Sequence, residues 1–238
     1  MKTLGLIGGT SWLSTVDYYK TINQQINERL GGLNSAKLFL YSINFEEFKP
    51  PADPNAWAPL ATSLINIAQK LITAGADCIV LCANTPHMVA GIIQQQINVP
   101  LIHIAEATAN AIAAKKISKV GLLGTKLTME QPFFRDKLTQ QGIDILTPPD
   151  DERAFIHASI FDELGKNIFK KETKEKYLAI INKLIQQGAQ GIIFGCTELP
   201  LLIQPQECPV PVFDTLLIHA TAAVDFALKE SSLREAKR

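Results

Sequence analysis

The feature that most constrains this chain is an internal duplication. Three landmarks in the first half of the 238-residue sequence recur, in the same order, in the second half. The matched segments are Leu4-Gly5-Leu6-Ile7-Gly8-Gly9-Thr10 with Val120-Gly121-Leu122-Leu123-Gly124-Thr125, Gly75-Ala76-Asp77 with Gly188-Ala189-Gln190, and Val99-Pro100-Leu101-Ile102-His103 with Val210-Pro211-Val212-Phe213-Asp214. Chance does not readily produce three matches in one order, so we expect two similar lobes. The first would comprise residues 1–116 with a C-terminal helix at about 215–229, and the second residues 117–214.

In both halves, apolar blocks of strand length alternate with longer segments of helical period. Leu4–Ile7, Lys37–Ile43 and the wholly apolar Cys78–Leu81 are predicted strands, and Trp57–Ala74 is a predicted helix. Strands that alternate with helices favour right-handed βαβ units. The predicted fold class is therefore α/β with parallel sheets, in two lobes related by a pseudo-two-fold axis.

The first helix is predicted to begin at Ser14 as its N-cap, with Asp17 as a weak capping partner three residues later. Gly31-Gly32 would end it. The apolar residues at helical spacing, which we expect to form its buried face, are Val16, Tyr19, Ile22, Ile26 and Leu30.

Two cysteines stand where the duplication predicts chemistry. Cys82 and Cys196 each follow a predicted buried strand, and in open α/β sheets ligands bind beyond the carboxyl ends of the strands. If the lobes face each other about a two-fold axis, the two thiols lie on opposite sides of one ligand in the cleft. This arrangement suits a reaction that removes a proton from one face of a carbon and returns it to the other face.

Polar residues beside the two cysteines fit a ligand that carries a carboxylate. Both segments are predicted to open helices, whose N-termini bind carboxylates. The same helix ends lower a thiol pKa, whereas a bound carboxylate raises it, and the sequence leaves that balance open. Asn84 and Thr85 would equally suit helix capping, and Glu198 the positive end of a helix dipole. The candidate substrate-binding residues here are Thr10, Ser11, Asn84, Thr85, Thr125, Thr197 and Glu198.

Composition narrows the function classes. Lys plus Arg and Asp plus Glu each number 23, so the net charge is zero and a nucleic-acid partner is not expected. No apolar run approaches the ~18 residues of a membrane span, and no signal peptide is recognisable, so we expect a cytoplasmic protein. Four cysteines give no disulfide framework or zinc spacing. The Gly-rich start matches neither nucleotide motif. The predicted partner is therefore a small molecule.

Other conspicuous residues have ordinary structural roles in this interpretation. The four histidines, at 87, 103, 157 and 219, show no metal-ligand spacing, so we expect core or surface positions and no metal site. Cys78 falls inside its strand and Cys208 precedes a proline, so both are expected to be structural. Trp12 and Trp57 are expected to be packing residues.

Taken together, these motifs resemble the aspartate/glutamate racemase family. The resemblance covers nearly the whole chain, including Asp151-Glu152-Arg153 and Asp162-Glu163-Leu164. It rests on Gly8-Gly9-Thr10-Ser11-Trp12-Leu13-Ser14-Thr15 with Tyr18-Tyr19, Cys82-Ala83-Asn84-Thr85-Pro86-His87, and Gly195-Cys196-Thr197-Glu198.

The resemblance implies an amino-acid racemase of two flavodoxin-like lobes, without pyridoxal phosphate or any other cofactor, and a homodimer. Cys82 and Cys196 would be the catalytic thiolate base and thiol acid, with Asn84, Thr85, Thr197 and Glu198 holding the substrate's α-carboxylate and amino group. Many members bind the side-chain carboxylate with an Arg in a first-lobe loop and a Lys in the second lobe. Lys166 matches the Lys, but the loop from Phe45 to Pro54 contains no Arg and only Lys49.

Three alternatives remain open at this level. Another two-cysteine enzyme, such as a maleate-type isomerase or a hydantoin racemase, would use the same scaffold, and in an isomerase one cysteine would attack carbon. A non-catalytic amino-acid-binding protein would not need the thiols. A pyridoxal enzyme would be coloured when purified.

Overall fold

The computed structural model describes residues 1–48 and 54–229. The chain divides into two compact units, Met1–His103 with His219–Arg238, and Ile104–Ile218. Each unit contains a four-stranded sheet, ordered β2-β1-β3-β4 in the first and β6-β5-β7-β8 in the second, and every strand pair is parallel. The predicted α/β class with two similar lobes is confirmed.

The division between the units differs from the one expected near residue 116. Helix α4 (Ile104–Ala114) belongs to the second unit, because its buried side chains, including Ile104 and Ile112, join that unit's core with Phe134. Polar contacts add to this packing, since Lys137 pairs with Glu106 at 3.3 Å. The second boundary, at residues 218 and 219, falls inside the last helix, so most of that helix belongs to the first unit.

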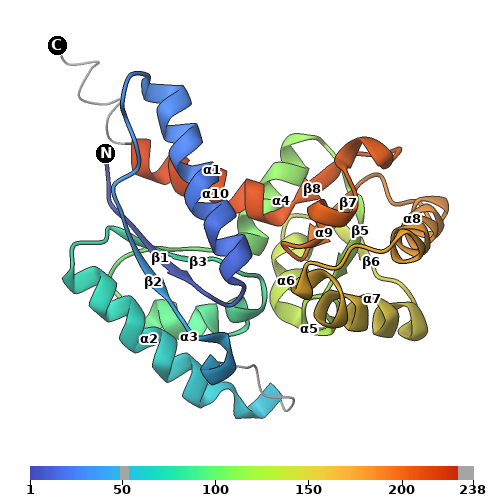
Figure 1. The fold of residues 1–238 in the computed structure, drawn as a ribbon, viewed down its shortest axis with the longest axis horizontal. Helices are drawn as coiled ribbons and strands as arrows, with labels where there is room; N and C mark the ends of the chain where they lie inside the picture. Colours follow the sequence, from blue (N-terminus) through green and yellow to red (C-terminus); the bar gives the residue numbers. More distant parts are fainter. Residues whose placement is uncertain (49–53, 230–238) are drawn as a thin grey trace. The chain divides into compact units, whose positions relative to one another are not determined.

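The first unit has helices on both faces of its sheet. In Figure 1, α2 and α3 lie on one side of β1, β2 and β3, and α1 with α10 on the other. Hydrogen bonds join α1 to α10, including Gln25 to Thr221 at 2.9 Å. The elements are β1 (Leu4–Gly8), α1 (Trp12–Leu30), β2 (Leu38–Ser42), η1 (Phe45–Phe48), η2 (Pro54–Trp57), α2 (Ala58–Thr73), β3 (Cys78–Leu81), η3 (Thr85–Val89), α3 (Ala90–Gln95), β4 (Leu101–Ile102) and α10 (Thr215–Leu228).

The second unit repeats this sheet with a different set of helices. Its core gathers apolar side chains from both faces, among them Leu122, Tyr177 and Phe194. The elements after α4 are β5 (Lys119–Gly124), α5 (Lys126–Glu130), α6 (Pro132–Thr139), β6 (Asp144–Leu146), α7 (Asp150–Asp162), η4 (Leu164–Lys166), α8 (Lys171–Gln186), β7 (Ile192–Gly195), α9 (Leu199–Leu202), η5 (Pro205–Glu207) and β8 (Val212–Asp214). Among the helices so described, none has the length and hydropathy to cross a membrane.

The duplication extends to individual hydrogen bonds. The glycine of the second landmark has a positive φ in both units, +109° and +98°. Two residues after it, a side-chain oxygen accepts from the backbone N–H just before the first strand. Asp77 accepts from Thr3 at 2.6 Å, and Gln190 accepts from Ser118 at 3.0 Å. The same turn therefore ties the third strand of each sheet to the start of its first strand.

The first helix differs from the prediction in two respects. Its N-cap is Ser11, whose hydroxyl accepts from the N–H of Ser14 at 3.4 Å, so the helix begins at Trp12, three residues earlier than a cap at Ser14 would give. The buried face consists of Ser14, Thr15, Tyr18, Ile22 and Ile26. Val16, Tyr19 and Leu30, expected to be buried, are exposed. The prediction used apolar residues to find the buried face. It therefore missed the first turn, where the buried residues are the polar Ser14 and Thr15.

Candidate active site

Cys82 lies immediately beyond the carboxyl end of β3, where the chain leaves the first sheet. Its backbone N–H donates to the carbonyl of Ile7 at 2.9 Å, which continues the pairing between β1 and β3. The residue is only 2% exposed. Its thiol contacts the carbonyl oxygen of Val80 at 3.8 Å, a long and weak hydrogen bond. A rigid, buried strand therefore fixes this sulfur at the edge of the sheet where ligands bind.

The segment after Cys82 is a short 3-10 helix, and this differs from the α-helix expected there. It spans Thr85–Val89, and Asn84 at its N-cap makes no side-chain capping bond to it. Capping alone therefore does not explain Asn84, which is nevertheless buried. Thr85 is partly exposed. A single five-residue 3-10 helix offers little of the dipole that a long α-helix would aim at a thiolate.

Cys196 occupies the matching place beyond β7 in the second unit. It is 8% exposed. The preceding Gly195 pairs in register with Gly124 of β5, and a Cβ on Gly195 would come within 2.9 Å of the carbonyl oxygen of Leu123. Glycine is needed here because the two backbones approach so closely. The helix that follows, α9, is only four residues long, so it too falls short of the helix expected from sequence.

Glu198 links the polar residues around Cys196. One of its carboxylate oxygens accepts from the Cys196 thiol at 2.9 Å and from the Thr197 hydroxyl at 2.8 Å. The Glu198 residue is buried. The structure thus joins three of the residues predicted from sequence in one hydrogen-bonded group. A carboxylate this close to a thiol can hold the thiol proton in a defined direction.

Burial controls the acidity of both thiols. Loss of hydration raises the pKa of Cys82 far above the ordinary thiol value. The pKa of Cys196 is also raised strongly, first by burial and then by the negative charge of Glu198, against a lowering effect of backbone N–H groups. The balance that the sequence left open therefore favours the protonated thiol in both units before any ligand binds.

The loop after β1 brings Thr10 and Ser11 to the same edge as Cys82. Gly9 makes its turn possible with φ of +92°, and its N–H donates to the hydroxyl of Thr15 at 2.8 Å. That hydroxyl donates in turn to the carbonyl of Ser11 at 2.8 Å. Ser11 acts as the helix cap, whereas Thr10 faces a pocket described below.

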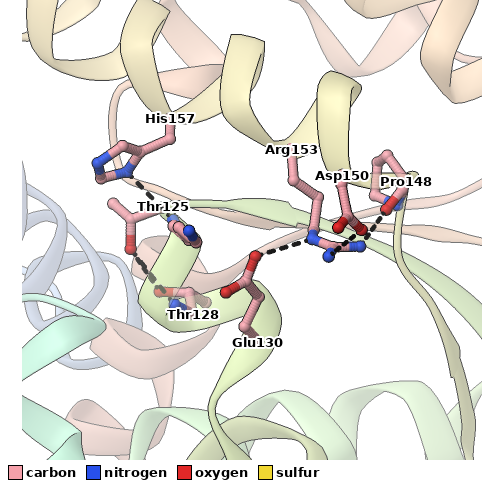
Figure 2. A network of polar contacts seen from close by, with 8 residues as sticks. Thr125, Thr128, Glu130, Pro148, Asp150, Arg153 and His157 are labelled. Atoms are coloured by element: carbon pink, nitrogen blue, oxygen red, sulfur yellow. Dashed lines mark hydrogen bonds and ion pairs between the residues drawn. The ribbon is translucent and has the colours of Figure 1, made fainter. Parts of the chain in front are cut away.

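Thr125 holds the equivalent position after β5 and caps α5. Its hydroxyl accepts from the N–H of Thr128 at 3.3 Å. Figure 2 shows the polar network around this helix, in which the His157 ring bonds its first turn. The backbone N–H of Lys126 donates to Nδ1 of His157 at 3.2 Å. The loop at this mouth of the second sheet is therefore firmly fixed by side chains.

Arg153, part of the sequence resemblance, stabilises the same region. Its guanidinium donates to Glu130 at 3.0 Å, to Asp150 at 2.6 Å and to the carbonyl of Pro148 at 2.7 Å (Figure 2). With its donors engaged in this way, Arg153 connects α5 to the start of α7. Its position supports a structural role for this arginine within the second unit.

Lys166 is less constrained than the other predicted residues. It ends the 3-10 helix η4, and its ammonium lies 3.6 Å from the carboxylate of Asp162. The side chain is 61% exposed, so this contact contributes little energy. Lys49, the basic residue noted in the first-lobe loop, lies outside the described residues.

A pocket in the first unit collects side chains from the loops after β1, β2 and β3 and from the start of α2. It encloses about 270 Å³ of space between atoms, part of it open to solvent. Thr10 and Thr85 line it together with apolar side chains such as Phe45 and Leu60. Trp57 also lines it and is 4% exposed. From sequence Trp57 is expected to be only a packing residue, because nothing in its spacing connects it with Thr10 or Thr85.

No metal centre accompanies these groups in the part of the chain that the structure describes, since no three His, Cys, Asp or Glu side chains gather there. The buried histidines have structural partners. His87 Nδ1 bonds the carbonyl of Ala83 at 2.9 Å, and His219 bonds Tyr18 and the carbonyl of Ile102 at 2.8 and 2.7 Å. The expected core roles of these two histidines are thereby accounted for.

Known proteins share both the sequence pattern and the fold. Residues 7–223 match the family described as Asp/Glu/Hydantoin racemase. A structure from Yersinia pestis, provisionally called an Asp/Glu racemase, is 49% identical with a TM-score of 0.91 over 96% of this chain and 100% of that one. An aspartate racemase homologue from Pyrococcus horikoshii is 38% identical with a TM-score of 0.84, covering 95% and 99% of the two chains. The broad specificity amino-acid racemase RacX of Bacillus subtilis is 26% identical over 71% of this chain and 73% of its own.

Proposed function

Because the chain belongs to the Asp/Glu/hydantoin racemase family, we propose that it is an amino-acid racemase that uses Cys82 and Cys196 as its two proton carriers. The single observation that carries the proposal is the matched position of these thiols. Each is a buried cysteine directly after the third strand of a sheet, and the two sheets have the same strand order. Cys78 and Cys208 have no such counterparts.

The proposed reaction is a proton transfer in two steps. One cysteine, as thiolate, takes the α-proton of the amino acid, so the C–H bond breaks and an S–H bond forms. The electron pair stays on the α-carbon and is delocalised into the carboxylate. The other cysteine, as thiol, gives its proton to the opposite face, which leaves the mirror-image amino acid and a thiolate. The scheme consumes no co-reactant and includes no cofactor.

The polar residues next to the cysteines have roles in this scheme. Asn84, Thr85 and Thr197 would donate hydrogen bonds to the substrate carboxylate, whose negative charge grows as the α-proton leaves. Glu198 would direct the Cys196 proton, because its carboxylate already accepts from that thiol at 2.9 Å. A substrate ammonium close to the reacting sulfur would lower the thiol pKa and oppose the effect of burial.

Proton exchange in D₂O tests the proposal directly. The purified protein, in reducing buffer without added cofactor, is incubated with single L-amino acids including aspartate and glutamate. Loss of the α-proton signal by NMR, together with the D-enantiomer by chiral chromatography, is the expected result. A panel that shows neither exchange nor enantiomer, with both thiols verified as free, would refute amino-acid racemisation. A stable mass adduct on one cysteine would instead indicate the isomerase chemistry of the superfamily.

The pH profile supplies a second test. One thiol must be ionised and the other protonated, so kcat/KM should follow a bell-shaped curve. Since burial raises the pKa of both thiols, we expect the activity maximum on the alkaline side of neutrality. A rate that stays constant from about pH 6 to 10 would contradict two-thiol catalysis.

A further inference from the structure

The pocket beside the Cys82 motif combines an apolar wall with very few polar groups. It is formed within the first unit by the loops after β1, β2 and β3 and by the start of α2. Ile43, Phe45, Leu60 and Leu64 supply hydrocarbon surface. Among the described residues that line it, none carries a charge. A carboxylate that entered this space would therefore lose hydration and gain no cation from these lining residues in return.

Trp57 is the unusual residue of this pocket. Its side chain is 4% exposed, and its indole Nε1 is buried with no hydrogen-bond partner within the described part of the chain. Buried indole N–H groups ordinarily find an acceptor, and an unsatisfied donor costs stability. A ligand acceptor that bonded such a donor in a pocket wall would gain more than elsewhere, because it would complete a hydrogen bond that the described residues leave unmade.

The position of the pocket connects it to the proposed reaction. Thr10 follows β1 and Thr85 lies three residues after Cys82, and both line the pocket. A substrate whose α-carbon is reached by the Cys82 sulfur would thus have this space next to its side chain. The pocket is narrow and partly open, so it accommodates a short side chain and not a bulky one.

Resting on the proposed racemase function, we propose that this pocket receives the substrate's side chain and selects one that is short, uncharged and ends in a hydrogen-bond acceptor. The indole N–H of Trp57 is the donor for that acceptor. The preferred substrates are accordingly neutral amino acids, with an amide, hydroxyl or ether oxygen at the side-chain end, and not aspartate or glutamate.

Three amino acids of nearly one shape test the two parts of this proposal. Aspartate, asparagine and leucine share a branched side chain of the same size, and they carry a charge, a neutral acceptor and only hydrocarbon, respectively. For the unmodified protein, kcat/KM for racemisation should be highest for asparagine. We expect leucine to be lower by roughly 3- to 10-fold, the worth of one neutral hydrogen bond, and aspartate by roughly 100-fold, because its charge is buried uncompensated.

Trp57→Phe keeps the aromatic wall and removes the donor. The ratio of asparagine to leucine should fall to about one, while the ratio of asparagine to aspartate stays high, because the pocket is still uncharged. Circular dichroism and a thermal melt establish whether the variant folds. If it does not, the ratios of the unmodified protein still decide the question.

Lys49 provides the sharpest control, since it adjoins Phe48 of the pocket in sequence and is the basic residue nearest to it there. Lys49→Gln should leave all three rates within about twofold, because the proposal gives this lysine no role in charge recognition. Faster turnover of aspartate than asparagine, or of glutamate than glutamine, would overturn the inference while leaving the racemase function intact. If the preference for the acidic substrates were then lost in Lys49→Gln, Lys49 would be the cation that binds their side-chain carboxylate. Absence of racemisation with every amino acid tested would instead count against the proposed function itself.

Discussion

The two cysteines occupy matching places in two sheets of one strand order, yet their surroundings differ. The sulfur of Cys82 contacts the backbone carbonyl of Val80, at 3.8 Å. Cys196 has the carboxylate of Glu198 at 2.9 Å, shared with the hydroxyl of Thr197. Backbone position has thus been kept between the units while the neighbouring side chains have diverged. The comparison teaches that matching proton carriers need not have matching acidity, since burial raises the pKa of both thiols and the Glu198 carboxylate raises that of Cys196 further.

The largest expected effect comes from removing either thiol. Cys82→Ala and Cys196→Ala should each lower racemisation by about 1000-fold, because each face of the α-carbon loses its only acid or base. Chiral chromatography measures the product. Cys78→Ala is the matched control, since Cys78 is also buried and begins β3, four residues before Cys82. Near-normal activity in one of the two alanine variants would mean that the units are not equivalent partners.

The next effect sharpens the difference between the thiols. In the native protein burial, and with it the negative charge of Glu198, raises the pKa of Cys196. Glu198→Gln removes this charge and keeps the size of the side chain. We therefore expect alkylation of Cys196 to begin at lower pH in the variant, and the Cys82 profile to stay unchanged. Racemisation should fall by roughly 10- to 100-fold as the Cys196 proton loses its acceptor. Mass spectrometry of iodoacetamide-treated protein across a pH series measures both thiols in one sample.

Glu207→Gln serves as the control for this change. Glu207 lies in the same unit and pairs with Lys174 at 2.6 Å, away from both cysteines in sequence. Its substitution should move neither alkylation profile. If Glu198→Gln also left the Cys196 profile in place, the carboxylate would have no influence on the thiol, and the asymmetry between the units would be only structural.

A smaller effect concerns stability at low pH, which should involve the first unit more than the second. Burial lowers the pKa of His87 to about 4 and that of His219 to about 3. Both are neutral when folded, whereas an unfolded histidine takes up a proton near pH 6.5. Stability is therefore complete above pH 6.5 and declines as the pH falls from there toward 4, by on the order of 3 kcal/mol for each histidine.

Urea unfolding at a series of pH values measures this decline. His219→Gln should reduce its slope between pH 6.5 and 4, while His157→Gln in the second unit should change it less, because His157 is only partly buried. Hydrogen exchange would show whether the first unit opens first. Equal slopes in the two variants would contradict a special role for the buried histidines of the first unit.

The smallest effect isolates one hydrogen bond. His219 Nε2 faces the carbonyl of Ile102, so it carries the proton, and Nδ1 must accept from the Tyr18 hydroxyl at 2.8 Å. Tyr18→Phe should cost about 1 to 2 kcal/mol, because it leaves a buried acceptor unsatisfied. Tyr177→Phe is the counterpart in the second unit. It removes the 2.9 Å hydrogen bond between the hydroxyls of Tyr177 and Ser159, but the Ser159 hydroxyl keeps its bond to the carbonyl of Ile156. We expect a smaller loss there by thermal unfolding.

Repetition in the sequence was enough to predict the two sheets and to place both cysteines beyond their third strands. The sequence also predicted that Thr197 and Glu198 belong to the site around Cys196. The start of the first helix was missed, because Ser11 and Ser14 are both good caps and only the buried Thr15 decides between them. The short helices after the cysteines were overestimated for a related reason, since apolar residues there pack without extending a helix.

The pocket could not have been predicted from sequence order. Its lining combines Thr10, Phe45, Trp57 and Thr85, which come from four different elements and loops. Each residue taken alone is readily explained by packing or capping. Only the tertiary fold brings the four of them together as the lining of one pocket. That the indole nitrogen of Trp57 has no hydrogen-bond partner among the described residues depends on its surroundings and not on the residue type.

Helix α10 gives the first unit an order of assembly as well as a shape. Its His219 bonds the buried Tyr18 of α1 at 2.8 Å, and the carbonyl of Ala227 accepts from the N–H of Lys2 at 2.9 Å. A chain made from its N-terminus would finish the second unit first, although the second unit is encoded later. The thiol at residue 82 would then acquire its final setting after the thiol at residue 196, although residue 82 is synthesised earlier.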